Sequence, residues 1–221
     1  MPARIKGPRE FQQCFGVSDE TLEKLVVYET LLKQWQKKIN LVAPSTLDDI
    51  WHRHFADSAQ LLALAPRCAR KWVDLGSGAG FPGLVLAIMR FGRGGESDQE
   101  PHVLIESDQR KAAFLGEIAR KTSVAVDIAI SRIELSSTQG RYTSVDVVSA
   151  RALAPLDRLI GLAKPMFGPE SVGLFLKGRD VAQEIEAARS KWSFTCELVQ
   201  SLTESEARIA VVTSPEARSE G

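Results

Sequence analysis

The segment that points most directly to chemistry is a glycine-rich stretch with one acid near its start, WVDLGSGAGFPGLVLAIM from Trp72 to Met89. Asp74 lies at the end of a short apolar run, and Gly76, Gly78 and Gly80 alternate after it. Glycine-rich turns between a strand and a helix usually hold a nucleotide-like ligand, because backbone N–H groups there approach it closely. The stretch therefore predicts a ligand-binding turn, and the question is which ligand it binds.

Three interpretations of this turn are open. The run from Gly78 to Gly83 matches the dinucleotide fingerprint G-x-G-x-x-G, but the first fingerprint glycine should follow the strand closely, where Gly76 stands. Counted from Gly76, the third glycine position is Phe81. A carboxylate at Asp74 would repel a pyrophosphate and would favour S-adenosylmethionine, which is cationic and carries no phosphate. The third interpretation is a structural tight turn with no ligand.

Acidic and apolar residues at the next two predicted strand ends suit an adenosine ligand. Glu106 ends the run HVLIE, and an acid at the second strand end typically binds ribose hydroxyls. After the third strand, Ile133 is expected to pack on an adenine ring, with Glu134 or a backbone N–H at its polar edge. A solvated strand-end carboxylate is the alternative interpretation of Glu106.

Two cationic residues follow at the ends of the fourth and fifth predicted strands. Arg151 is expected to position the cofactor or the substrate, or to contact RNA phosphate, and a surface salt bridge is its alternative. Lys177 is expected to contact a phosphate or a base. Because ligands of an open α/β sheet bind at the carboxyl ends of the strands, all these side chains should line one cleft.

The chain lacks the groups that many methyl transfers need. Enzymes that methylate exocyclic amines often carry N/D-P-P-Y/F after the fourth strand, and this sequence has no Pro-Pro. Pyrimidine C5 methylation needs a nucleophilic cysteine, and none of Cys14, Cys68 and Cys196 lies at a predicted strand end. Guanine N7 has an exposed lone pair and no proton, so in-line transfer to it needs positioning and no strong general base.

Hydrophobic periodicity supplies the elements that position these residues. Helices are expected over 18–39 and about 47–64, with no strand in the first third of the chain. From Lys71 onward, short β-branched runs alternate with helical stretches, with a short turn after the third strand and two final strands near 194–200 and 207–213. This alternation predicts an α/β fold with a mostly parallel sheet of about seven strands. We expect an N-terminal helical extension over 1–66, a domain over 67–221 packed with it as one unit, and an exposed polar loop over 92–101.

Composition narrows the function classes. The 221 residues carry 28 Lys plus Arg and 28 Asp plus Glu, so net charge gives no indication of bulk nucleic-acid or membrane attraction. Three widely spaced cysteines argue against a disulfide framework or a zinc site. The sequence shows no apolar segment of membrane-spanning length and no signal peptide, and a cytoplasmic protein is expected.

Taken together, these motifs resemble a known family. The combination is Trp35 with Ile39–Val42, Arg53–Ser58 (RHFADS), Val73–Gly83 (VDLGSGAGFPG), Ser131–Glu134 (SRIE), Ser149–Ala152 (SARA) and Leu176–Gly178 (LKG). It resembles the bacterial RsmG family, also called glucose-inhibited division protein B, over about residues 20–213. The resemblance implies a class I S-adenosylmethionine-dependent methyltransferase (Rossmann-like) fold. It also implies N7 methylation of a guanine in 16S rRNA, in a loop near the decoding centre.

The resemblance also assigns residues. It implies cofactor contacts at Gly76, Phe81, Ile133, Glu134 and Arg151, to which the turn and strand-end arguments add Asp74, Gly78, Gly80 and Glu106. Arg151 is expected to position the reacting groups. Substrate contacts are expected at His54, Asp57, Ser58 and Lys177, with a structural polar cluster as the alternative for the first three. No metal and no membrane partner are expected, and the protein is expected to be a monomer.

An RNA substrate requires a local basic surface on a chain of zero net charge. We expect it from Arg4, Lys6, Arg9, Lys37, Lys38, Arg53, Lys177 and Arg179, with the assembled small-subunit particle as a possible form of the substrate. Three other functions stay open at this stage: methylation of another substrate on the same fold, an NAD-dependent Rossmann oxidoreductase, and a non-catalytic RNA-binding module.

Overall fold

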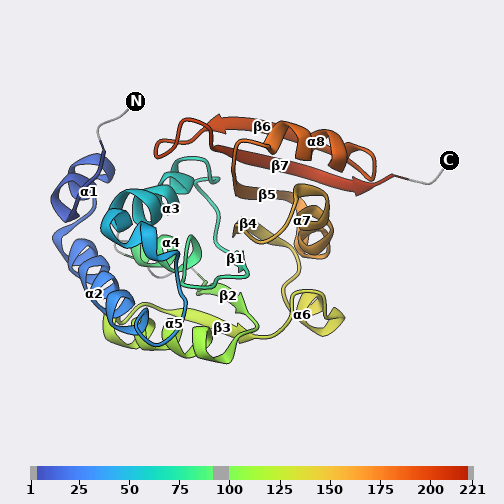
Figure 1. Cartoon of the computed structure of the whole chain (residues 1–221). Coiled ribbons are helices and arrows are strands. Elements are labelled where there is room, and N and C mark those ends of the chain that lie inside the picture. Colours follow the sequence, from blue (N-terminus) through green and yellow to red (C-terminus); the bar gives the residue numbers. More distant parts are fainter. Residues whose placement is uncertain (1–3, 92–99, 219–221) are drawn as a thin grey trace.

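The computed structural model describes residues 4–91 and 100–218, so the loop expected over 92–101 lies almost entirely outside the described residues. A seven-stranded sheet of order β3-β2-β1-β4-β5-β7-β6 forms the centre of the molecule (Figure 1). The strands are β1 (Trp72–Leu75), β2 (His102–Glu106), β3 (Val126–Ile130), β4 (Val145–Arg151), β5 (Phe167–Lys177), β6 (Trp192–Gln200) and β7 (Arg208–Ala217). Strands β1 to β5 are parallel, and β7 is antiparallel to both of its neighbours.

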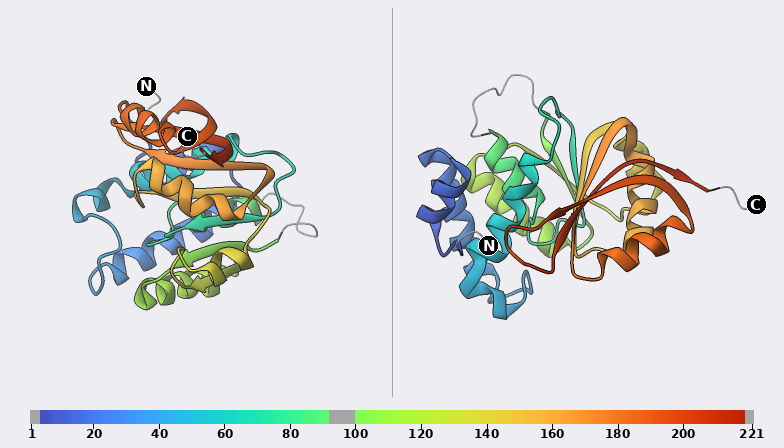
Figure 2. Two further views of the ribbon diagram at one scale, coloured as in Figure 1. Left: turned by 90° about the vertical axis from the view of Figure 1, so that its right-hand side faces the viewer. Right: turned by 90° about the horizontal axis from the view of Figure 1, so that it is seen from above.

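Helices cover both faces of the sheet (Figure 2). One face carries α1 (Pro8–Phe15), α2 (Asp19–Trp35), α3 (Asp57–Ala59), α4 (Gly83–Phe91) and α5 (Gln109–Thr122). The other carries α6 (Ser136–Arg141), α7 (Leu156–Ala163) and α8 (Val181–Arg189). Side chains alternate along β1, so Val73 and Leu75 enter the core under α6–α8 while Asp74 faces α4. The fold class expected from the sequence is confirmed.

The helical segments of the first third differ in detail from expectation. Helix α1 was not expected, because its eight residues hold few apolar side chains. The helix expected over 47–64 is instead a succession of a 3-10 helix (Pro44–Asp49), a π-helical segment (Trp51–Ala56), α3 and a second 3-10 turn (Gln60–Ala63). Hydrophobic spacing predicts helical structure there but does not distinguish these hydrogen-bond patterns.

Two further segments differ from the structure expected from the sequence. Helix α2 ends at Trp35 and not at residue 39, because the Gln36 side chain accepts the N–H groups of Leu41 and Val42 and donates to the Val42 carbonyl. The segment after β3, expected to be only a turn, contains α6.

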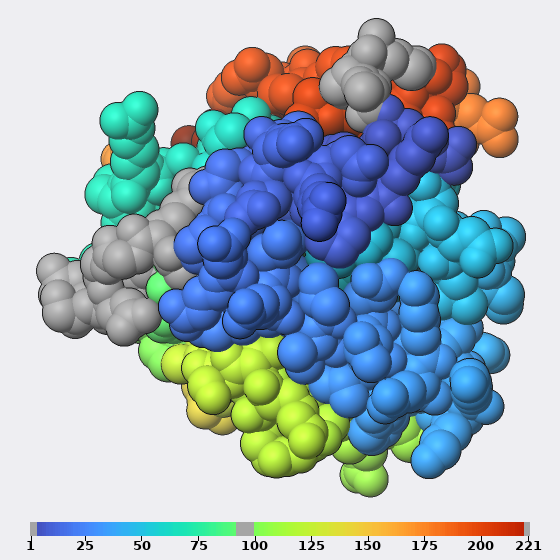
Figure 3. All heavy atoms as spheres, turned by 90° about the vertical axis from the view of Figure 1, so that its left-hand side faces the viewer, coloured from blue at the N-terminus to red at the C-terminus, as the bar shows by residue number. Residues whose placement is uncertain are grey.

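The N-terminal helices and the sheet domain share one core. Leu25, Tyr28 and Leu32 of α2 are fully buried against α4 and α5, and Figure 3 shows α1 and α2 (blue) covering this face. The Tyr28 hydroxyl donates to the carbonyl of Ala79, inside the glycine-rich turn. The N-terminal extension therefore helps to fix the shape of that turn, and a domain boundary at residue 66 stays an interpretation of the sequence.

We predict that Gly83→Ala destabilises the protein by roughly 1–3 kcal/mol through overpacking. A Cβ atom at Gly83 would lie 2.5 Å from Asp74 Cβ and 2.6 Å from Leu104 Cδ2, both on buried strands. Urea unfolding measures the change. Gly140→Ala is the control, because a Cβ there meets no atom within 4 Å. Equal stability of the two variants would contradict the close contact between α4 and β1.

Candidate functional site

Strand register brings the predicted site residues to one edge of the sheet. Leu75 of β1 pairs with Ile105 of β2 and with Ala150 of β4. The residues that follow these two partners, Glu106 and Arg151, therefore flank Gly76. By the same register Ser131 follows the end of β3 and Lys177 ends β5, so the acidic, apolar and cationic strand ends form one continuous edge.

The glycine turn takes backbone conformations that L side chains rarely adopt. The φ angles are +64° at Gly76, +56° at Gly78 and +91° at Gly80. A Cβ atom at Gly76 would lie 2.7 Å from Leu153 Cδ1, and one at Gly80 would meet the Tyr28 hydroxyl. Two of the three glycines are thus required both by conformation and by a close neighbour.

Glu106 ties the turn to β2. Its Oε2 accepts the Gly78 N–H at 2.8 Å, and its Oε1 accepts the Asp108 N–H at 2.7 Å. The side chain is buried, and each carboxylate oxygen has a second lone pair with which to accept another hydrogen bond. Glu106 therefore orders the turn and can also accept ligand hydroxyls.

A cavity of about 280 Å³ opens above these groups. It brings together six of the predicted cofactor residues, Gly76, Gly78, Glu106, Ile133, Glu134 and Arg151, together with Ile105, Ser107, Lys111, Ser131, Arg132, Ala152 and Leu153. Ile133 is buried and gives this cavity an apolar surface, whereas Glu134 is exposed and accepts a hydrogen bond from Arg158 at 3.3 Å. We call it the first cavity.

Asp74 and Gly80 do not line the first cavity. Asp74 is 2% exposed, faces Gly83 and accepts the Ser149 hydroxyl hydrogen bond at 2.6 Å. Burial raises the pKa of this carboxyl to about 6. Asp74 therefore lies one layer below the surface of the turn, where its charge acts at a distance, and direct contact with a ligand stays a prediction.

Phe81 is also a core residue. Its ring, 4% exposed, lies 5.3 Å from the parallel ring of Tyr28 and 4.9 Å from the imidazole of His54. The Arg151 guanidinium carbon lies 5.0 Å from the centre of the Phe81 ring, a cation–π geometry. Phe81 supports the arginine from below and does not line the first cavity, so its expected contact with the cofactor stays a prediction.

Arg151 is held from three directions. Besides the Phe81 ring, its Nη1 donates to the carbonyl of Arg53 at 3.2 Å and lies 3.6 Å from Asp57 Oδ2. The other oxygen of Asp57 accepts the Thr203 hydroxyl at 2.7 Å and the Gln60 amide at 3.0 Å. Burial lowers the pKa of Arg151 and raises that of Asp57, while their mutual attraction opposes both shifts.

A second cavity, of about 430 Å³, lies on the other side of Arg151. It is lined by Asp57, Arg151, Ala152, Leu153, Ala154, Pro155, Leu176, Lys177, Gly178, Glu184 and Ala207. Arg151, Ala152 and Leu153 line both cavities, so this short segment is the wall between them.

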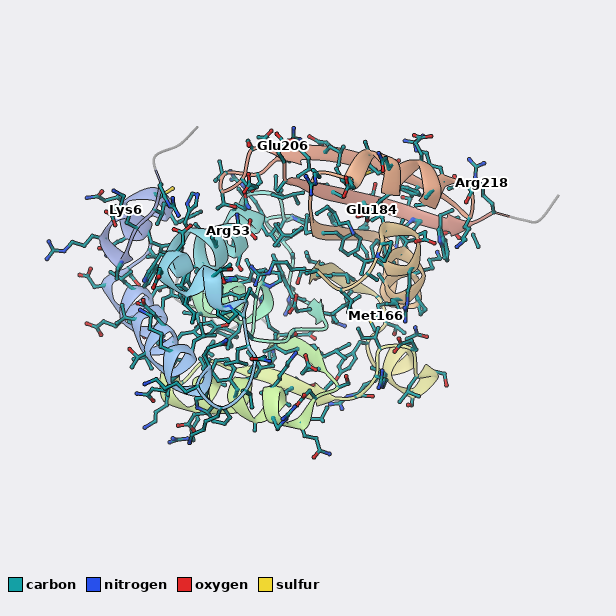
Figure 4. The ribbon with its side chains drawn as sticks, viewed as in Figure 1. Lys6, Arg53, Met166, Glu184, Glu206 and Arg218 are labelled. Atoms are coloured by element: carbon teal, nitrogen blue, oxygen red, sulfur yellow. The ribbon has the colours of Figure 1, made fainter. Side chains whose placement is uncertain are left out.

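Lys177 lines the second cavity, but its ammonium group already has partners within the protein. The ammonium donates to the Ala154 carbonyl at 2.9 Å and pairs with Glu184, which is labelled in Figure 4, and only 8% of the side chain is exposed. Glu184 also accepts the Leu156 N–H at 2.8 Å. The pair braces the wall of the cavity, and a substrate contact by Lys177 stays a prediction.

Two other predicted substrate residues face the protein interior. His54 accepts or donates a hydrogen bond with Thr46 Oγ1 at 2.8 Å, and its Nδ1 is buried without a partner among the described residues. Ser58 is fully buried and donates to the His54 carbonyl at 2.7 Å. Both lie on or beside the π-helical segment that carries Arg53, labelled in Figure 4, and neither lines the two cavities.

Sequence reasoning missed several residues that shape the site. Leu153 supports Gly76, Tyr28 closes over Gly80, and Thr203 and Gln60 orient Asp57. Leu153 could have been found by its place just after a strand end. The others come from distant helices and from the loop between β6 and β7, where no motif marks them.

Two absences apply to the described residues. Nowhere in residues 4–91 and 100–218 do three or more His, Cys, Asp or Glu side chains gather in a way that could hold a metal ion. Over the same residues, no helix has the length and apolar character to cross a membrane.

The buried imidazole of His54 should make the stability of the protein depend on pH. Burial and the neighbouring Arg151 lower the pKa of His54 to about 3, below its ordinary value of 6.5. The unfolded chain therefore binds the extra proton between these values, and stability present above pH 6.5 is lost as the pH falls toward 3. In His54→Gln, the loss between pH 6 and 4 should be smaller by up to about 1.4 kcal/mol per pH unit.

Urea unfolding at several pH values measures this slope. Ser58→Ala is the control, because it removes a buried hydroxyl from the same segment without removing a titratable group. An unchanged slope in His54→Gln would contradict a neutral, buried His54.

The amino-acid sequence that forms this site matches a known protein family. The profile described as GidB, rRNA small subunit methyltransferase G, matches residues 21–212. The chain is 50% identical over 209 residues to Ribosomal RNA small subunit methyltransferase G of Parvibaculum lavamentivorans, covering 95% of this chain and 90% of the relative. It is 49% identical over 200 residues to the protein of the same name from Methylorubrum populi, covering 90% and 91%.

Solved structures show the same fold at low sequence identity. A fibrillarin/Nop5p complex aligns with a TM-score of 0.54 at 10% identity, covering 72% of this chain and 80% of that chain. A mutant of MtNAS in complex with S-adenosylmethionine aligns with a TM-score of 0.53 at 12% identity, covering 94% and 83%. The fold is that of the class I methyltransferases, and the chain belongs to the GidB family of rRNA small subunit methyltransferases G.

Proposed function

We propose that this protein transfers the methyl group of S-adenosylmethionine to N7 of a guanine in bacterial 16S rRNA, in a loop near the decoding centre. The observation that carries the proposal is the wall formed by Arg151, Ala152 and Leu153, which has a cavity on each side. Methyl transfer is an in-line displacement and needs donor and acceptor sites that meet at one point. Family membership supports rRNA as the acceptor.

The first cavity fits the donor. The turn at Gly76 and Gly78 allows close approach of a ligand to the backbone, and Glu106 retains acceptor capacity for two ribose hydroxyls. Ile133 offers an apolar face to an adenine ring, and Glu134 stands at its edge. Bound there, S-adenosylmethionine would supply a methyl group made electrophilic by its sulfonium, whose positive charge the buried carboxylate of Asp74 favours.

The second cavity suits an acceptor that needs no base. Its titratable side chains form two pairs, Asp57 with Arg151 and Lys177 with Glu184. Because both carboxylates are already paired, the described lining residues offer no free side chain that could accept a proton. Guanine N7 presents a lone pair and no proton, so positioning alone is sufficient. Arg151, fixed by Asp57 and Phe81, is the residue we propose to position the base against the donor.

The function is tested in the organism by nucleoside mass spectrometry of 16S rRNA. We expect one 7-methylguanosine to be lost when the gene is deleted and restored by the wild-type gene but not by a variant with Arg151→Gln. Unchanged 7-methylguanosine after deletion would contradict the RNA substrate. Binding of NADH without binding of S-adenosylhomocysteine would contradict the methyltransferase chemistry and favour an oxidoreductase.

The donor site is tested separately by Glu106→Gln. The amide replaces a carboxylate oxygen by an NH2 group that repels the Gly78 or Asp108 N–H and donates where ribose hydroxyls should donate. We expect the dissociation constant for S-adenosylhomocysteine, measured by calorimetry, to rise about 10- to 100-fold, as the loss of charge-assisted hydrogen bonds implies.

Glu117→Gln is the matched control, because Glu117 lies on the neighbouring helix α5 and pairs with Arg120 at the surface. Equal affinities of the two variants would place the ribose away from Glu106.

A further inference from the structure

A polar cleft beside the first cavity is not used by the chemistry proposed above. It has a volume of about 430 Å³ and is lined by Gln36, Lys37, Lys38, Ile39, Asn40, Asp108, Arg110 and Lys111. It is formed by the turn after α2 and the first turn of α5, two helices that pack together (Figure 3). We call it the α2–α5 cleft.

Positive charge dominates this cleft. Four cationic side chains, Lys37, Lys38, Arg110 and Lys111, face one carboxylate, Asp108. Asp108 is already engaged: it accepts the N–H of Arg110 at 2.8 Å and pairs with the Arg110 guanidinium at 3.2 Å. These bonds lower its pKa to about 2, so it stays ionised and bound to its own helix. Among the described residues, the three lysines have no carboxylate partner.

Three of the other six residues of the expected basic surface are neutralised by ion pairs. Arg4 pairs with Asp49 at 2.7 Å, Arg53 with Glu204 at 2.9 Å, and Lys177 with Glu184. On a chain with equal numbers of cationic and acidic residues, an uncompensated cluster beside the donor site is therefore a specific feature. Fixed positive charge in a cleft raises the local concentration of anions.

The cleft is shaped by fixed backbone. The Gln36 side chain bridges the N–H of Leu41, the N–H of Val42 and the carbonyl of Val42, which closes the turn that presents Lys37 and Lys38. The opposite wall begins at the capped first turn of α5, whose N–H groups add partial positive charge. An ordered turn loses less entropy on binding than a flexible arm of lysines would.

The cleft adjoins the first cavity, which in turn adjoins the second. Lys111 lines the cleft and the first cavity, and Arg151 lines the first and second cavities. The three hollows thus follow one another along the carboxyl edge of the sheet. A polynucleotide with one base in the second cavity would have its chain running across the donor site toward the lysines.

We propose that the α2–α5 cleft binds the phosphodiester backbone of the RNA substrate, at nucleotides flanking the target base. The inference rests on the proposed rRNA substrate and adds the place where its backbone binds. Lys37 and Lys38 contact phosphate oxygens, and Lys111 links this contact to the donor site. Phosphate contacts of this kind position the RNA and carry no sequence information.

The test is the double variant Lys37→Gln, Lys38→Gln, whose residues are exposed and do not line the first cavity. Binding to 16S rRNA and to small ribosomal subunits is measured over a range of salt concentrations. We expect affinity to fall roughly five- to tenfold and the slope of log K against log salt to decrease by about 1.4, which is about 0.7 for each lost contact to single-stranded RNA. Affinity for S-adenosylhomocysteine should not change.

The control is Arg67→Gln, Lys121→Gln, which removes two exposed charges before β1 and at the end of α5, at the opposite edge of the sheet. An equal loss of RNA affinity in both double variants would overturn the proposal in favour of a general charge effect. Unchanged RNA affinity in the cleft variant would also overturn it and would direct attention to an acidic protein partner. Because binding is measured without turnover, a wild-type protein that binds RNA but forms no 7-methylguanosine would contradict the proposed function alone.

Discussion

Arg151 stands between two cavities, and the contacts that hold it come from three separate parts of the chain. Asp57 and the Arg53 carbonyl belong to the N-terminal helical segment, and Phe81 belongs to the glycine-rich stretch. Thr203, from the loop between β6 and β7, fixes Asp57 in turn. A buried guanidinium is costly unless it is paired, so these partners set both its charge and its position. The folded arrangement of helices, turn and hairpin is thereby coupled to the point where donor and acceptor meet.

Glycine and tyrosine packing supplies the second constraint. Tyr28 reaches from α2 to bond the Ala79 carbonyl and stacks on Phe81, so the N-terminal extension closes the turn from outside. Gly83 lets α4 approach Asp74 on β1 from inside. The turn is therefore shaped from both sides before any ligand binds, which lowers the entropy cost of binding.

The sheet, the order of helices and most of the first cavity could be predicted from the sequence, for a physical reason. Strand ends are marked by a change from apolar to polar residues, and parallel register then brings Glu106 and Arg151 to either side of Gly76. Roles that depend on side-chain direction could not be predicted in this way. Asp74 and Phe81 belong to the glycine-rich motif, yet both side chains are buried. Alternation along β1 points Asp74 into the protein, and aromatic packing does the same for Phe81. Pairing partners such as Glu204 for Arg53 lie far along the chain and have no local signal.

The central claim is that donor and acceptor sites meet at the wall formed by Arg151, Ala152 and Leu153. A crystal structure of the protein with S-adenosylhomocysteine tests it most directly. We expect the ribose hydroxyls within hydrogen-bond distance of Glu106, the adenine against Ile133, and the sulfur atom at the wall, facing the second cavity. A ligand whose sulfur points away from Arg151, or which binds outside the first cavity, would contradict this account.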